Sequence, residues 1–237
     1  MGGNPHRKTN WPTKRANAEA MTHTVDLFWS FRSPYSYIVV PKLLELERDW
    51  DAKVNVRPVL PIAVRQPDFF AQADPLWFSY LMRDCIRSAE FAGLPLRWPR
   101  PDPVVMDYAT RTYPKEQPHI HRLTRLGVLA AERGIGLPVL RAISHLIWSG
   151  ETDSWHEGDH LAKALAGIGC DLAEMDAVQA AEAARLDEVI KQNEADQRLG
   201  GHYGVPLMVY AGEPFFGQDR YDQLVWRMQQ QGLSARG

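Results

Sequence analysis

The sequence predicts an α/β fold in which a small strand-and-helix unit is interrupted by a long helical segment. Three observations predict it. A strand-like run over residues 24–31 meets a helix start at Ser33-Pro34, the stretch 61–199 carries mainly helical patterns, and strand-like runs return only after residue 204. Strand signals at both ends of a helical stretch indicate one sheet built from the two ends of the chain.

The N-terminal unit is predicted to run strand, helix, strand. Residues 24–31, T-V-D-L-F-W-S-F, have the β-branched and aromatic composition of a buried strand. Ser33 is a good N-cap and Pro34 suits the first helical position, so we expect a helix from here to about Asp49. The alternating residues 53–60 predict a second strand, which completes a βαβ unit.

The rest of the chain is predicted to be helices followed by a hairpin and a last helix. Gly, Pro and Asp breakers delimit helices at 75–92, 118–133, 138–149, 158–168 and 177–199. Residues 205–210 predict a strand, 211–213 a tight turn, 214–216 its partner and 219–231 a closing helix. This order describes a thioredoxin-like fold (βαβ…ββα) with a large all-helical insertion domain. We expect a disordered extension at 1–22, a thioredoxin-like domain from 23–60 plus 200–232, and the helical insertion domain at 61–199.

Composition limits the classes of function. With 27 basic and 29 acidic residues the formal net charge is -2, which gives no electrostatic reason to expect nucleic acid or an acidic membrane as partner. The two cysteines, Cys85 and Cys170, are too far apart for a CxxC motif and favour a reducing compartment. The sequence has no apolar run of bilayer length and no apolar secretory segment near its start. We expect a soluble cytoplasmic enzyme that binds a small neutral or weakly anionic molecule.

The start of the first helix is the first candidate site. In thioredoxin-type folds the free N–H groups and the dipole of this helix stabilise a thiolate. Redox members carry Cys-x-x-Cys there, whereas this chain has Ser33-Pro34-Tyr35-Ser36 and cannot exchange disulfides by that mechanism. The helix end can still bind a thiolate from another molecule, with the Ser33 hydroxyl donating to it. The alternative is that Ser33 is only a helix cap.

Two later segments add to this site. Gly204-Val205-Pro206 opens a strand, where proline removes a ladder donor. It is either an edge-strand proline or the cis-proline that lies beside the reactive helix in thioredoxin-like folds. Residues 215–220, F-F-G-Q-D-R, place polar groups at the start of the last helix, where Asp219 either caps the helix or receives an ammonium group.

The S-P-Y-S, G-V-P and F-F-G-Q-D-R segments resemble those of the 2-hydroxychromene-2-carboxylate isomerase family, which is similar to kappa-class glutathione transferases and DsbA-like oxidoreductases. The likeness extends from Val25 to about Met228. It includes Tyr80-x-x-Arg83-Asp84-x-x-Arg87, Gly93-Leu94-Pro95 and Trp148-x-Gly150 in the helical segment.

The resemblance implies that glutathione is the cofactor and assigns residues to it. Ser33 is then the catalytic serine, Val205 with Pro206 the backbone partner of the glutathione cysteine, and Gln218 with Asp219 the γ-glutamyl site. Family members carry a Gly-rich loop with Lys and Asn after the second strand. Here the segment is 60–67, L-P-I-A-V-R-Q-P, in which Arg65 stands in for the lysine and the asparagine has no counterpart.

The activity implied by the resemblance is glutathione-dependent isomerisation of a small aromatic conjugated carbonyl compound, by thiolate addition, bond rotation and elimination. The resemblance also implies a homodimer. Two enzymatic alternatives are a kappa-like glutathione transferase and a relative of the DsbA-family oxidoreductases. An alternative of another class is a redox-inactive thioredoxin-like module that binds peptides in the proline groove.

The remaining motifs predict structure rather than chemistry. His156-x-x-x-His160 has a spacing that suits a metal on a helix, but a glycine interrupts it and no third ligand is evident, so we expect no metal site. His202 lies just before the proline of Val205-Pro206 and either faces the site or, as we expect, lies in a solvated loop. The aromatic residues of 77–80 are expected to pack at the domain junction rather than to form a substrate box, although the two are compatible.

Overall fold

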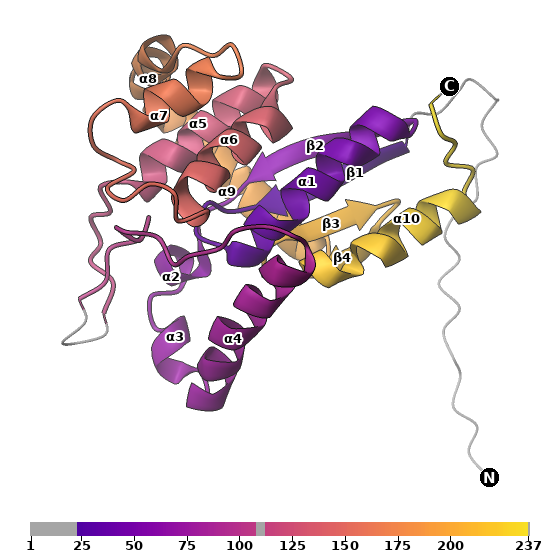
Figure 1. Cartoon of the computed structure of the whole chain (residues 1–237), viewed down its shortest axis with the longest axis horizontal. Helices are drawn as coiled ribbons and strands as arrows, with labels where there is room; N and C mark the ends of the chain where they lie inside the picture. The colour runs from indigo at the N-terminus through magenta and orange to yellow at the C-terminus, as the bar shows by residue number, and fades with distance from the viewer. Residues whose placement is uncertain (1–22, 108–111, 237) are drawn as a thin grey trace.

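A four-stranded sheet joins the two ends of the chain (Figure 1). The computed structural model describes residues 23–107 and 112–236. The sheet has the order β2-β1-β3-β4. β1 (His23–Trp29) runs parallel to β2 (Ala52–Pro58) and antiparallel to β3 (Leu207–Tyr210), and β3 pairs antiparallel with β4 (Glu213–Phe216). This topology confirms the predicted thioredoxin-like fold with a helical insertion.

Helices form most of the described chain. They are α1 (Pro34–Asp49), α2 (Ile62–Arg65), α3 (Phe69–Gln72), α4 (Pro75–Phe91), α5 (Ile120–Glu132), α6 (Gly136–Trp148), α7 (His160–Ala166), α8 (Leu172–Ala181), α9 (Ala183–Leu199), the 3₁₀ helix η1 (Gln218–Arg220) and α10 (Tyr221–Gln230). In the described residues none of these is long and apolar enough to cross a membrane.

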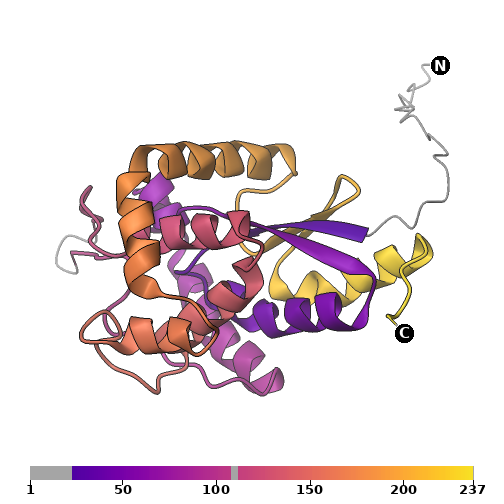
Figure 2. The same ribbon diagram turned by 90° about the horizontal axis from the view of Figure 1, so that it is seen from above.

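The sheet is covered on both faces. Figure 2 shows α1 and α10 on one face and α9 on the opposite face, and the helices between α4 and α9 lie beyond the β2 side of the sheet. Coverage by helices explains the apolar composition of the strands. Val25, Leu27 and Trp29 on β1, for example, have no exposed surface. The β3–β4 turn puts Ala211 and Gly212 at positive φ, 51° and 80°, as a two-residue hairpin requires.

Two buried tryptophans, one on α6 and one on β1, hold the backbone around the start of α1. The indole N–H of Trp148 on α6 donates to the Phe31 carbonyl at 2.9 Å, and that of Trp29 donates to the Ser36 carbonyl at 2.9 Å. Both indoles are fully buried, so each hydrogen bond satisfies a polar group that water cannot reach. The backbone on both sides of Ser33 is therefore fixed by the core.

The helical segment corrects the sequence-based prediction in two places. The helix predicted at 177–199 is wrong as one element, because the chain breaks at Glu182 (φ -105°, ψ 17°) between α8 and α9. The prediction also missed the four-residue helices α2 and α3. The expected closing helix from 219 begins as η1 and becomes α-helical only at Tyr221. The predicted extension at 1–22 lies outside the described residues.

Candidate functional site

Ser33 is the N-cap of α1. Its backbone is extended (φ -109°, ψ 117°), its Oγ accepts a hydrogen bond from the Ser36 amide at 3.1 Å, and Pro34 follows at the first helical position. The free N–H groups of this helix end carry a partial positive charge that stabilises an anion. The cap interpretation and a role in binding an anion are therefore compatible at this residue.

The segment before β3 lies against Ser33. The Val205–Pro206 peptide bond is cis, as the sequence predicts, and the Ser33 hydroxyl donates to the Val205 carbonyl at 3.4 Å. O–H···O bonds are usually about 2.7–2.8 Å long, so this donor is only weakly engaged. The hydroxyl can redirect to a stronger acceptor that enters between the two segments.

Ser36, where redox members carry the second cysteine, faces the interior. It has no exposed surface, and its Oγ has no hydrogen-bond partner in the described part of the chain. Cys85 is buried in α4 and Cys170 follows α7. Burial raises the pKa of the Cys85 thiol, which disfavours the reactive thiolate. Dithiol chemistry at the start of α1 therefore has no residues to perform it.

A cavity of about 340 Å³ opens beside Ser33. Most of its wall is apolar or aromatic. It is lined by Ser30, Arg32, Ser33, Pro34, Tyr35, Pro61, Ile62, Arg65, Phe69, Phe70, Trp77, Phe78, Tyr80, Leu81, Trp98, His202, Tyr203, Gly204, Val205 and Phe216. The aromatic residues of 77–80 thus line the cavity. They form part of a pocket wall, which the expectation of a mainly packing role did not include.

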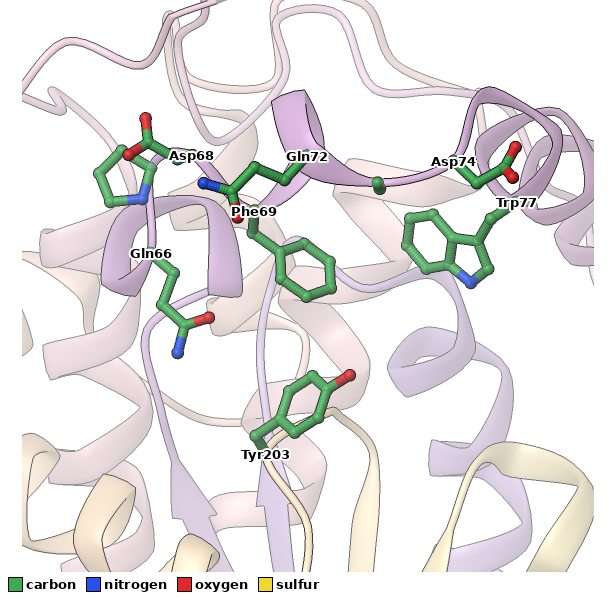
Figure 3. Close-up of a pocket in the computed structure, with 9 residues that line it drawn as sticks. Gln66, Asp68, Phe69, Gln72, Asp74, Trp77 and Tyr203 are labelled. Carbon is green, nitrogen blue, oxygen red and sulfur yellow. The ribbon is translucent and has the colours of Figure 1, made fainter.

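A second, more open cavity of about 670 Å³ lies next to the first. Figure 3 shows the rings of Phe69, Trp77 and Tyr203 turned toward one another, whereas the carboxylates of Asp68 and Asp74 point away from them. The ring centroid of Phe69 is 5.9 Å from that of Trp77 and 6.1 Å from that of Tyr203. Because these three residues line both cavities, they form an aromatic partition between an outer and an inner chamber.

Two polar residues of the inner cavity were missed by the sequence analysis. Arg32 pairs with Asp102 through contacts of 2.9, 3.2 and 2.9 Å. The Tyr35 hydroxyl donates to the Asp84 carboxylate at 2.7 Å. Burial first, and then Asp84, raise the pKa of Tyr35, so its hydroxyl stays protonated. Both partners are distant in sequence, 70 residues for Arg32 and 49 for Tyr35, and no local motif signals such pairs.

Arg65 lines the cavity, but its terminal nitrogens are bound to the protein. One donates to the Tyr203 carbonyl and the other to the Gln197 side-chain oxygen, both at 3.0 Å. The Gln197 amide in turn donates to the Gly204 carbonyl at 2.7 Å. Burial lowers the pKa of Arg65 from its ordinary value, although a guanidinium remains charged at neutral pH.

Gln218 and Asp219 lie close to the cis-proline along the chain but do not line the inner cavity. The Gly217 amide donates to the Pro206 carbonyl at 2.9 Å, which brings η1 beside this segment. The Gln218 side chain contacts the Ser88 hydroxyl at 3.4 Å, and Asp219 forms an ion pair with Arg220 at 2.9 Å. Neither η1 nor α10 has a side-chain cap, so Asp219 does not cap the helix. A γ-glutamyl site at these residues stays a prediction.

Of the two places open to His202, the structure shows the one that faces the site and not the solvated loop we favour from the sequence. Its ring stacks on Phe216 with centroids 3.7 Å apart and lines the inner cavity. His156 packs against His119, with centroids 4.7 Å apart, rather than beside His160 on a helix. Among the described residues no group of three His, Cys, Asp or Glu side chains could hold a metal.

Comparison with known proteins identifies the family of the chain and solved structures with the same fold. A family model for the DSBA-like thioredoxin domain matches residues 24–229, whereas no curated protein matches the sequence. A solved 2-hydroxychromene-2-carboxylate isomerase is 20% identical, with a TM-score of 0.62 over 87% of this chain and 95% of its own. A probable DsbA oxidoreductase from Streptomyces coelicolor is 18% identical, with a TM-score of 0.59 over 88% of this chain and 89% of its own.

A third solved structure is the cytosolic disulfide reductase DsbM from Pseudomonas aeruginosa with GSH. It is 17% identical, with a TM-score of 0.54 over 88% of this chain and 98% of its own. At these identities the likeness to solved structures shows the fold. Because the family model spans most of the sequence, the chain belongs to the DsbA-like thioredoxin family.

Proposed function

We propose that the protein is a glutathione-dependent isomerase of the 2-hydroxychromene-2-carboxylate isomerase type. The observation that carries the proposal is a serine in place of the redox cysteine. Ser33 caps α1, faces the Val205 carbonyl and borders an aromatic cavity. A helix N-terminus with a hydroxyl donor but no thiol suits a thiolate supplied by another molecule.

The residues present fit glutathione. Ser33 has a weakly engaged donor for the thiolate, and the Val205 backbone lies beside it for the cysteine unit of the tripeptide. Pro206 follows Val205 directly, Arg65 lines the same cavity, and Gln218 with Asp219 would hold the γ-glutamyl end. When bound, glutathione supplies a nucleophile that adds to a conjugated double bond and leaves again after rotation. The protein itself keeps this thiol ionised through the α1 N-terminus and the Ser33 hydroxyl.

The cavity wall supports an aromatic substrate. Phe70, Phe78, Trp98 and Tyr203 are among the residues that line the inner chamber, and a volume of about 340 Å³ lies at the lower end of the usual range for ligand pockets. Such a wall stacks on a planar ring and excludes water from the reacting carbon. The solved isomerase with this fold and the DsbM structure with GSH support the same reading of substrate and cofactor.

The compartment and assembly follow as parts of the proposal. The cytoplasm supplies reduced glutathione, and two free cysteines are typical of a protein in that reducing compartment.

A homodimer is supported by α4, which exposes Leu76 (78%) and Phe91 (92%), because large exposed apolar side chains are typical of interaction surfaces. Sedimentation analysis of the purified protein measures the assembly directly.

The test is isomerisation of an aromatic conjugated pyruvate, or of its cyclic hemiketal, followed by ultraviolet absorbance. Turnover should require glutathione, and the glutathione should be recovered unchanged. Ser33→Ala should lose most of this activity, whereas Ser36→Ala, which removes a buried and unpartnered hydroxyl, should retain it. Consumption of glutathione with formation of a stable thioether would identify a transferase instead. Equal turnover with and without glutathione would contradict the proposal.

A further inference from the structure

We infer that Arg65 and Gln197 are positioning residues that hold the cis-proline segment, residues 202–206, where its backbone meets the bound thiol compound. The inference rests on the proposed function for the identity of that compound. The positioning of the segment is argued from hydrogen bonds within the chain alone. The inference also changes the role of Arg65 from a ligand-binding residue to one that acts through the backbone of the segment.

Three consecutive carbonyls of the cis-proline segment each accept a hydrogen bond from a different side chain. Tyr203 accepts from Arg65 at 3.0 Å, and Gly204 accepts from Gln197 at 2.7 Å. The third, Val205, accepts from Ser33 at 3.4 Å. The first two bonds have normal to short lengths and the third is long. The side chains therefore hold the segment mainly at the carbonyls of Tyr203 and Gly204. The Val205 carbonyl beside Ser33 is held less tightly.

Gln197 connects the two anchors. Its side chain is fully buried, accepts from Arg65 through its oxygen and donates to Gly204 through its nitrogen. Removing that amide would leave a half-buried carbonyl and a largely buried guanidinium each short of a partner, which is more costly than the net worth of the hydrogen bonds themselves. Both terminal nitrogens of Arg65 donate to the protein, whereas its buried Nε has no partner among the described residues. The two donated bonds suit Arg65 to holding the segment.

One face of α9 fixes both sides of the cavity mouth. The Asn193 amide donates to the Pro58 carbonyl at 3.0 Å, and the Glu194 carboxylate accepts from the Leu60 amide at 3.1 Å. Together with Gln197 these side chains bind the chain just after β2 and the chain just before β3. The helix is polar on a buried face for this reason, and it sets the distance between the segment that carries Arg65 and the cis-proline segment.

This arrangement matters because the cis-proline segment precedes the strand. β3 begins at Leu207, so Val205 is not held by the β-ladder, and its position follows from the side-chain anchors and from the Gly217 amide on the Pro206 carbonyl. A binding segment that is held in place before the ligand arrives loses less conformational entropy on binding. Loosening the segment should therefore weaken glutathione binding without altering the groups that ionise the thiol.

The experiment compares Gln197→Glu, Gln197→Met and the matched control Gln192→Met. Glu at 197 keeps an oxygen for Arg65 but loses the donor to Gly204, and Met loses both functions. Gln192 lies on the same helix, is exposed, and bonds only to Asp196 among the described residues. The measurements are hydrogen–deuterium exchange of peptides covering 202–210, the dissociation constant for glutathione, and the pKa of the bound thiol.

Both variants at 197 should exchange faster in 202–210 and bind glutathione roughly ten-fold more weakly, since about 1.4 kcal/mol corresponds to a factor of ten. The bound thiol pKa should not change, because Ser33 and α1 are intact. Arg65→Met should show the same faster exchange and weaker glutathione binding, and Arg65→Lys should show smaller changes in both. These two variants provide the test if Gln197→Met fails to fold.

Unchanged exchange in 202–210 would overturn the inference, and so would faster exchange with unchanged glutathione affinity. A wild-type protein that binds no glutathione would refute the proposed function instead. In that case the exchange data alone decide whether Arg65 and Gln197 hold the segment.

Discussion

Ser33→Ala separates a helix cap from a residue that binds the thiolate. The structural loss is one accepted bond from the Ser36 amide at 3.1 Å and one long donated bond to the Val205 carbonyl at 3.4 Å. Losing an N-cap costs about 1 kcal/mol, which lowers the melting temperature of a domain of this size by about 2–4 °C. Losing a donor to a developing or bound anion lowers turnover by about one to three orders of magnitude. The two losses differ enough to be told apart.

The assay is thiolate absorbance of bound glutathione against pH, with melting temperature measured on the same samples. Ser33→Ala should raise the pKa of the bound thiol. The matched control is Asp171→Ala, which removes a helix cap far along the chain from the site. Asp171 caps α8 by accepting from the Ala173 amide at 2.8 Å, so its loss should lower the melting temperature and leave the thiol titration unchanged. An identical titration for wild type and Ser33→Ala would show that Ser33 acts only as a helix cap and does not bind the thiolate.

Three further predictions follow from other residues of the fold. The protein should show only background insulin reduction or dithiol oxidation; turnover that survives replacement of Cys85 and Cys170 by alanine would contradict the proposal that glutathione supplies the reactive thiol. Ser36→Ala should raise the melting temperature slightly, because a buried hydroxyl without a partner is removed, and a clear fall would show that the hydroxyl is engaged. Burial, followed by His156, lowers the pKa of His119, so the unfolded chain binds its proton first and stability should fall as the pH drops below about 6.5. His119→Phe should flatten that fall in melting temperature, and an unchanged slope would show that other groups cause it.

The parts of the site that the sequence predicts are those with short-range signals. Ser33-Pro34 indicates a helix start from two adjacent residues, and Val205-Pro206 places a proline where a strand would lose a donor. The thioredoxin-like order of strands then brings these two dipeptides together, and the structure has them in contact.

The parts that the sequence did not predict depend on how the helical segment folds back. Gln197 is a polar residue in a polar helix, and nothing in its neighbours indicates that it is buried against Gly204. Arg32 meets Asp102 only because the loop before α5 returns to the start of α1. The break at Glu182 lies in a run of alanine and glutamate that favours an unbroken helix. It is set by packing, since α8 and α9 both contact α5.

We propose that Ser33 and Val205 together receive the thiol of glutathione, and a crystal structure of the protein grown with glutathione measures this contact. We expect the sulfur within hydrogen-bond distance of the Ser33 Oγ, the cysteine backbone of glutathione paired with Val205, and the open face of the sulfur turned to the inner aromatic cavity. Glutathione bound only in the outer cavity, or with its sulfur away from the start of α1, would show that Ser33 and Val205 do not form the thiol site.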